Sequence, residues 1–196
     1  MMNDKPVQWA GLNHLALITN DMDLTTRFWH GVIGASLVAT IGNDAFRHYF
    51  FDVGSGATVA FFEYREHAVE QFAKPSGIPD ERAIQFDHVS LNVPDQEALL
   101  ALRQRLVEHD CEVTDVVDHG LLKSIYFTDP NGIALEASWW VDNPTGRAPQ
   151  AGDRRYADTH PVPAAQELLE SGKISDLPAT KLIDEPTGDV YDFVQR

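Results

Sequence analysis

The feature that most constrains the fold of this chain is a repeat. The stretch LNHLALITND, which begins at residue 12, is matched by FDHVSLNVPD, which begins at residue 86. His14 and His88 take equivalent places in the two stretches, and Asp21 and Asp95 follow them at the same spacing. A repeat of this kind indicates one structural unit built twice. Two such units that pair can bring the two histidines together.

Both copies predict the same order of elements, β-α-β-β-β, from their hydrophobic periodicity and turn residues. In the first copy we expect a strand at 12–18, a helix at 22–30 and strands at 37–41, 48–53 and 58–64. In the second we expect a strand at 86–93, a helix that begins at Asp95, and strands at 112–118, 124–128 and 133–138. The predicted fold class is α+β, with paired βαβββ modules that form a curved mixed sheet around a metal-binding cavity.

The composition divides the chain into four parts. We predict a first module at 9–66, a linker rich in Pro and Gly at 67–83, a second module at 84–140 and an irregular C-terminal arm at 141–196. The arm is rich in Pro, Gly, Asp and Thr, and one helix is expected in it, at about 164–171. It can cover the cavity, pack on a partner subunit or be partly disordered, and the sequence leaves these three alternatives open.

The net charge argues against two classes of partner, and the cysteine content bears on disulfides and on the cellular compartment. The formal net charge of −15 argues against nucleic acid and against anionic membrane surfaces. The one cysteine, Cys111, excludes an internal disulfide and fits a reducing compartment. Because neither a signal-peptide pattern nor a long apolar run is present, we expect a soluble, cytoplasmic protein.

Three residues are candidate metal ligands. The second module closes with the apolar strand GIALEAS, which carries one acid, Glu136. An acid with apolar neighbours on both sides needs a partner, and a metal ion is a good one. Two histidines, His14 and His88, and one carboxylate on adjoining strands suit a catalytic divalent metal. No organic cofactor site is expected.

This arrangement resembles the vicinal oxygen chelate superfamily, which includes glyoxalase I, methylmalonyl-CoA epimerase, fosfomycin and bleomycin resistance proteins, and type I extradiol dioxygenases. The resemblance rests on paired β-α-β-β-β units with a His in the first strand and a Glu in the last. It covers residues 9–140 and leaves the C-terminal arm outside.

One stretch is similar to the signature of the extradiol dioxygenases in particular. The matching residues are Val117-Asp118-His119, then GLLKS, Ile125-Tyr126, Phe127-Thr128, Asp129-Pro130, Asn131-Gly132, IAL and Glu136. The family implies that His14, His88 and Glu136 are ligands of Fe(II), which Mn(II) or another divalent metal can replace. It also implies that His119 and Tyr126 are catalytic groups beside the bound substrate.

Within the repeat, we align Tyr49–Gly56 with Tyr126–Gly132 and allow one extra residue in the first turn. Ala60 then stands at the place equivalent to Glu136, where the glyoxalase I branch has a fourth ligand. Glu63 lies at an odd offset from Ala60, so we predict that it points to the other face and is not a ligand. Ring-cleaving members commonly carry an acid–base His near this place, and neither His48 nor His67 is expected in that register.

The function that the sequence favours is Fe(II)-dependent extradiol cleavage of a small catecholic aromatic substrate with O₂. The first alternative is a glyoxalase-like lyase, isomerase or epimerase that uses a divalent metal as a Lewis acid. The second alternative is a metal-free binding or resistance protein that sequesters a ligand in the same cavity. A homodimer is expected in each case, because single-domain members of the superfamily often pair two subunits.

Overall fold

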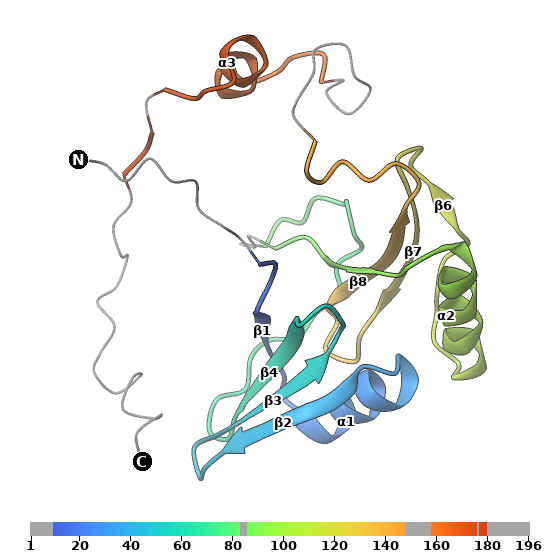
Figure 1. Cartoon of the computed structure of the whole chain (residues 1–196). Helices are drawn as coiled ribbons and strands as arrows, with labels where there is room; N and C mark the ends of the chain where they lie inside the picture. The colour runs from blue at the N-terminus through green and yellow to red at the C-terminus, as the bar shows by residue number, and fades with distance from the viewer. Residues whose placement is uncertain (1–9, 83–85, 148–157, 176, 180–196) are drawn as a thin grey trace. The chain divides into compact units, whose positions relative to one another are not determined.

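A computed structural model gives the fold of residues 10–82, 86–147, 158–175 and 177–179 (Figure 1). The first module is a four-stranded sheet of order β1-β4-β3-β2, in which β1 runs parallel to β4 and the other pairs are antiparallel. Its strands are β1 (His14–Ile18), β2 (Ser36–Gly42), β3 (Phe46–Asp52) and β4 (Thr58–Tyr64). Helix α1 (Met22–Thr26) begins at Asp21, whose side chain accepts a hydrogen bond from the backbone N–H of Leu24, and it continues as a π-helix, η1 (Arg27–Val32).

The second module repeats this topology in a sheet of order β5-β8-β7-β6. Its elements are β5 (Val89–Asn92), α2 (Gln96–Glu108), β6 (Val117–Asp118), β7 (Leu122–Thr128) and β8 (Ala134–Trp140). The predicted α+β class with paired βαβββ modules is confirmed, and the strands hydrogen-bond as two four-stranded sheets. Strand β6 is shorter than expected, because the described residues just before it form an isolated β-bridge with β7, between Val113 and Phe127, and no continuous ladder.

One hydrophobic core joins the two modules. In each sheet, alternate residues face the helix of the same module, as the period of two along a strand requires. The core contains Trp29 of η1, Phe61 of β4, Leu99 and Leu106 of α2 and Leu135 of β8, each with 0% exposure. With one face of each sheet committed to this core, the opposite face carries the candidate site.

The turn between β7 and β8 fastens the second module to the first through buried polar groups. Asp129 accepts a hydrogen bond of 3.2 Å from the Trp29 indole N–H. The Thr19 hydroxyl donates to Oδ1 of Asn131 at 2.6 Å, and Nδ2 of Asn131 donates to the Thr25 hydroxyl at 3.1 Å. Because burial disfavours its charged form, the pKa of Asp129 is raised, although hydrogen bonds from Asn131, Ile133 and Trp29 oppose that shift. This turn therefore holds β8, and with it Glu136, in a defined place.

The segment between the modules is also held in place. Asn20 exchanges two hydrogen bonds with the backbone of Val69, of 2.8 and 2.9 Å. A Cβ built on Gly132 would lie 2.3 Å from the carbonyl oxygen of Phe72, so the segment passes closer to this turn than any side chain would permit. The Gly132 backbone has φ +83°, which also favours glycine.

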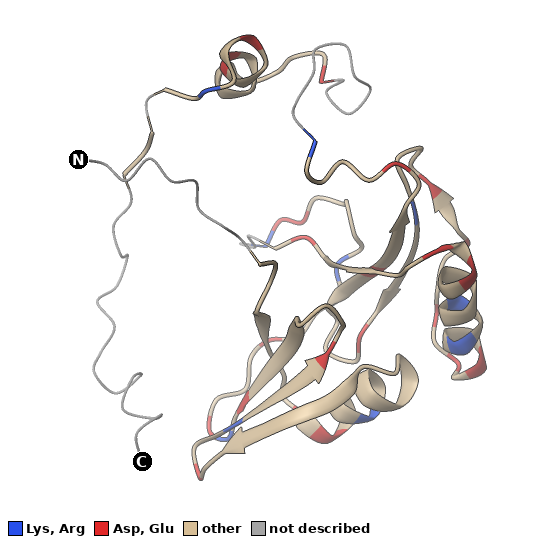
Figure 2. Cartoon of the chain, viewed as in Figure 1, with Lys and Arg blue, Asp and Glu red and all other residues tan. Residues whose placement is uncertain are grey.

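The chain divides after Asn143 into two compact units, and the second contains the helix α3 (Pro163–Ser171). Helix α3 starts with Pro163 and ends at Gly172, which has φ 70°. None of the helices in the described part of the chain has the length and apolar character that crossing a membrane requires. Acidic side chains occur on elements of both modules (Figure 2).

Candidate functional site

Glu136 lies in the middle of the second sheet, on the face away from the core. In the strand register it stands opposite Tyr126 of β7 and beside Ser90 of β5. Its side chain is buried, with 6% of the residue exposed. A carboxylate in such a place needs partners that compensate for lost hydration.

Four of the five predicted site residues form one connected row of polar contacts. Oε2 of Glu136 lies 3.1 Å from Nε2 of His88, and Oε1 accepts a hydrogen bond of 3.0 Å from the Tyr126 hydroxyl. The phenolic oxygen of Tyr126 lies 2.7 Å from Nε2 of His119. Since the single hydroxyl proton of Tyr126 is directed to the carboxylate, His119 is the donor in this last contact.

The surroundings of Glu136 favour its ionised form. Burial by itself raises the pKa of the Glu136 carboxyl, but the hydroxyls of Ser124, Ser90 and Tyr126 and the imidazole of His88 outweigh burial, so that the pKa is lowered. The Ser124 hydroxyl makes no hydrogen bond of ordinary geometry within the described residues. It lowers the pKa of Glu136 because it lies close to the carboxylate.

Tyr126 is held in its neutral form. Burial raises the pKa of its phenol, and the neighbouring Glu136 carboxylate raises it further. His119, in contrast, is exposed at the end of the row. A proton can therefore reach the row from solvent at His119, while Tyr126 keeps its own proton at neutral pH.

His14 lies on the corresponding face of the first sheet, opposite the face on which Leu15 and Leu17 pack against the core. Its ring meets those of Phe50 and His48, with centroids 5.7 and 6.4 Å away. Across residues 10–82, 86–147, 158–175 and 177–179, no three His, Cys, Asp or Glu side chains gather closely enough to hold a metal ion. The structure thus brings His88, Glu136, Tyr126 and His119 together, and His14 stays a predicted third ligand.

Both histidines are oriented by the side chain that precedes them. Nδ1 of His14 lies 2.7 Å from Oδ1 of Asn13, and Nδ1 of His88 lies 2.5 Å from Oδ1 of Asp87. Because a carboxylate only accepts hydrogen bonds, Nδ1 of His88 carries the proton. In each module Nε2 is left for another partner, an arrangement typical of metal-binding histidines.

The donor set of the second module fits a divalent metal. When Nδ1 alone carries a proton, the His88 imidazole presents a lone pair at Nε2, which faces the acceptor Oε2 of Glu136. Two acceptors at this distance require a proton or a shared cation between them. The observed separation of 3.1 Å is that of an ordinary hydrogen bond, and it also leaves the two atoms about as far apart as ligands bound at about 2.0–2.2 Å to one ion. An imidazole and a carboxylate together suit iron, manganese or zinc.

The strand register identifies the counterparts of the site in the first module. Phe50 stands opposite Ala60 there, as Tyr126 stands opposite Glu136 in the second module. This confirms Ala60 as the equivalent of Glu136. The predicted alignment of Tyr49 with Tyr126 is wrong by one residue, because the turns after the two strands have the same length and contain no extra residue.

His48 is a residue that the sequence argument misplaced. It pairs with Phe62, one step along the same face from the pair of Phe50 and Ala60, so it does share the face of His14. Its ring stacks on Phe62 with centroids 3.6 Å apart, and its Nε2 is buried with no hydrogen-bond partner among the described residues. Burial lowers the pKa of His48, and repulsion from His14 lowers it further. The sequence did contain a signal for this position: His48 lies two residues before Phe50, and residues two apart in a strand share a face.

Glu63 points to the other face of the first sheet. It pairs in register with Arg47, whose Nη1 donates to Oε2 of Glu63 at 2.5 Å. The Glu63 carboxylate therefore has an ionic partner on the face opposite Ala60. This position supports the prediction that Glu63 is not a metal ligand.

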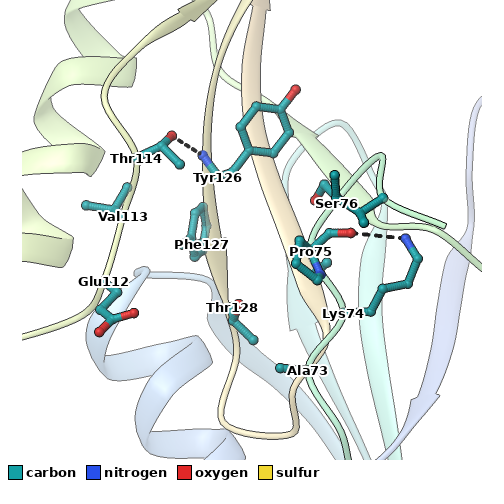
Figure 3. Close-up of a pocket in the computed structure, with 12 residues that line it drawn as sticks. Ala73, Lys74, Pro75, Ser76, Glu112, Val113, Thr114, Tyr126, Phe127 and Thr128 are labelled. Carbon is teal, nitrogen blue, oxygen red and sulfur yellow. Dashed lines mark hydrogen bonds between the residues drawn. The ribbon is translucent and has the colours of Figure 1, made fainter. Parts of the chain in front are cut away.

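A cavity of about 670 Å³ opens beside Tyr126 (Figure 3). Residues 73–76 and Ile78 of the inter-module segment line one side, and residues 112–114 with β7 line the other. In Figure 3 the backbone N–H of Tyr126 donates to the Thr114 hydroxyl, while the side chain of Lys74 turns back toward the carbonyl of Pro75. The cavity is large enough for a small organic ligand.

Comparison with known proteins identifies the family. Residues 11–137 match the model of the glyoxalase/bleomycin resistance protein/dioxygenase superfamily. The chain belongs to this superfamily. The match spans both modules and includes His14, His88, His119, Tyr126 and Glu136.

Solved structures of this superfamily share the fold. A glyoxylase/bleomycin resistance protein/dioxygenase domain from Frankia sp. EAN1pec is 21% identical, with TM-score 0.58, and the match covers 68% of this chain and 99% of that one. The lactoylglutathione lyase from Agrobacterium tumefaciens is 21% identical, with TM-score 0.51, and the match covers 69% of this chain and 96% of the lyase. At this identity the likeness concerns the fold alone. No curated protein matches the chain.

Proposed function

We propose that this chain is an Fe(II)-dependent extradiol-type dioxygenase that cleaves a small catecholic aromatic with O₂. The observation that carries the proposal is the row of contacts from His119 through Tyr126 and Glu136 to His88. It joins a candidate metal-binding pair to a titratable group at the protein surface. Superfamily membership supports a metal-dependent enzyme in general.

In this proposal His14, His88 and Glu136 hold the metal. A bound Fe(II) supplies redox chemistry with O₂, which imidazole and carboxylate ligands with open positions support. Asp87 fixes the His88 ring so that Nε2 faces the site. Ala60 provides no fourth ligand, which leaves positions open for substrate oxygens and for O₂.

His119 and Tyr126 move and hold protons in this proposal. The His119 imidazole, exposed and within hydrogen-bond distance of Tyr126, accepts a proton from a catechol hydroxyl and returns it later. The Tyr126 phenol keeps its proton, because its pKa is raised, and orients substrate oxygens as a neutral donor. The hydrogen bond to Glu136 fixes where that phenol points.

An aromatic row on the first sheet supports a flat, aromatic substrate. Phe50, His48, Phe62 and Tyr64 follow one another on the face that carries His14, with ring centroids of successive neighbours 4.2, 3.6 and 5.6 Å apart. Three of these four rings are half-buried and Tyr64 is exposed. Such rings favour contact with another ring by stacking or by edge-to-face packing.

The decisive experiment is oxygen uptake by anaerobically purified protein loaded with Fe(II), with a panel of catechols. We expect oxygen consumption that depends on catechol, with a new absorbance from the ring-opened product. Glu136→Ala should abolish both signals. Fe(II)-loaded protein that consumes no oxygen with any catechol would contradict the proposal.

A specific observation favours a second candidate, a redox-neutral lyase, isomerase or epimerase that uses a divalent metal as a Lewis acid. Ring-cleaving members commonly carry an acid–base His near the place of Ala60, and Ala60 itself is fully buried and cannot serve as one. This candidate predicts metal binding without oxygen uptake. A metal-free binding protein, the third class, predicts neither.

A further inference from the structure

Lys74 is a buried cation in the segment between the modules. Only 8% of the residue is exposed, although lysine is rarely buried unless it is paired. Its Nζ donates to Oδ2 of Asp87 at 2.6 Å and to the carbonyl oxygen of Pro75 at 3.1 Å. Figure 3 shows its side chain directed toward Pro75, beside the cavity. A buried ammonium with two such bonds is fixed in position.

Asp87 connects this lysine to His88. One carboxylate oxygen, Oδ2, is taken by Lys74, and the other, Oδ1, lies 2.5 Å from Nδ1 of His88. Oδ1 also accepts a hydrogen bond of 2.8 Å from the backbone N–H of Gly77. Two contacts from the inter-module segment therefore determine how the carboxylate meets the imidazole.

The first module has a neutral residue in the corresponding place. Asn13 meets Nδ1 of His14 there, at 2.7 Å. An amide oxygen is a weaker acceptor than a carboxylate, and an amide group does not require a cation. The ionic support of His88 is thus a difference between two modules that otherwise repeat.

We propose that Lys74 is a positioning residue of the site, which holds the Asp87 carboxylate so that Asp87 fixes the ring of His88 with Nε2 toward Glu136. Without the ammonium, the carboxylate would be free to rotate toward solvent. The His88 ring would then lose its anchor at Nδ1. The inference rests on the proposed role of His88 as a ligand, but its first test does not require a metal.

The first test is NMR of the full-length, metal-free protein labelled with ¹⁵N at histidine. A short hydrogen bond to a carboxylate should protect the Nδ1 proton of His88 from exchange and move its resonance downfield. We expect this resonance in the wild type and in Lys74→Arg, and its loss in Lys74→Met and in Asp87→Asn. Lys173→Met, which removes an exposed lysine of the second unit, is the matched control and should keep it.

The second test measures Mn(II) affinity by titration. Removing an outer partner of a ligand typically costs 10–100-fold in metal affinity, so we expect Lys74→Met to weaken binding by roughly tenfold or more. If Lys74 acts through Asp87, adding Lys74→Met to Asp87→Asn should change affinity by less than about twofold. Circular dichroism checks that each variant is folded, and Lys74→Arg should restore most of the affinity.

Two results would overturn the proposal. One is a protected His88 resonance that persists in folded Lys74→Met. The other is an equal loss of Mn(II) affinity from Lys74→Met with and without Asp87→Asn. If the wild type bound no Mn(II) or Fe(II), the proposed function would fail, while the NMR comparison would still decide the role of Lys74.

Discussion

Tyr126 and Glu136 face each other across β7 and β8, and the Tyr126 hydroxyl donates a hydrogen bond of 3.0 Å to Oε1 of Glu136. The same pair of positions in the first module holds Phe50 and Ala60. One copy of the repeat therefore carries a polar, proton-bearing pair and the other an apolar pair. The duplication has kept the scaffold in both modules, while this polar pair lies in the second.

This relationship predicts the effect of Tyr126→Phe, which removes one hydroxyl and keeps the ring. The Fe(II) content should stay within error of the wild type, because Tyr126 contacts the carboxylate and is not itself a proposed ligand. Turnover should fall by roughly 10²-fold or more if proton transfer limits the rate. Metal analysis and oxygen uptake on the same preparation measure both.

His119→Asn tests the outer end of the row. It removes the imidazole that contacts the Tyr126 hydroxyl and is not a proposed ligand, so we expect retained metal content and a similar loss of turnover. His109→Asn removes a histidine at the C-terminal end of α2 and serves as the control, with no change expected. Loss of iron from both His119→Asn and Tyr126→Phe would instead place these residues in the metal site or its scaffold.

A third prediction concerns the ligand set. Replacing His14, His88 or Glu136 singly by Ala should abolish stoichiometric binding of Fe(II) or Mn(II), since each removes a proposed ligand. Glu63→Ala is the matched control, because Glu63 is an acid of the first sheet that is paired with Arg47 on the other face. Loss of metal from Glu63→Ala would revive a four-ligand, glyoxalase-type site.

Much of the fold could be predicted because the element order predicted for one copy of the repeat can be checked against the other copy. His14 and His88 stand at equivalent positions near the starts of the first strands of their modules. Aligning the two copies then makes Ala60 the equivalent of Glu136, and the alternation of side chains along a strand puts both on the same face. The pairing of Tyr126 with Glu136 follows from the turn between β7 and β8. Periodicity and turn length are local properties, and local properties can be read from sequence.

The contacts that need two distant segments could not be predicted in this way. Lys74 lies in a stretch that has the composition of a linker, and only the folded chain shows that its ammonium is buried on Asp87. Asn131 belongs to a motif that suggests catalysis, yet its side chain bonds to Thr19 of the other module. Neither the depth of a side chain nor its partner across the core is encoded in spacing along the chain.

The pH dependence of stability should report the ionisation of Glu136. Its folded-state pKa is lowered from the ordinary value of 4.5, so the ionised form stabilises the folded state. This contribution is complete above about pH 4.5 and is lost as the pH falls through the lower, folded-state value. Glu136→Gln removes the titration. The difference in unfolding free energy between wild type and Glu136→Gln, measured with urea in metal-free protein, should therefore shrink on acidification; a difference that grows would reverse the assigned sign.

The close approach of the inter-module segment to the turn before β8 gives the last prediction. Gly132 and Gly56 occupy similar places in the two modules and have similar backbones, with φ +83° and +77°. A Cβ at Gly56 meets nothing within 4 Å, whereas one at Gly132 would lie 2.3 Å from the carbonyl oxygen of Phe72. Gly56→Ala should cost only the left-handed backbone strain, about 1–2 kcal/mol. Gly132→Ala adds displacement of a backbone segment, which overpacking data put at about 1–3 kcal/mol more. Urea unfolding of both variants measures the difference. The same segment carries Lys74, so Gly132→Ala should also weaken Mn(II) binding, while Gly56→Ala should leave it unchanged. Equal effects of the two substitutions on Mn(II) binding would show that the segment moves without disturbing the site.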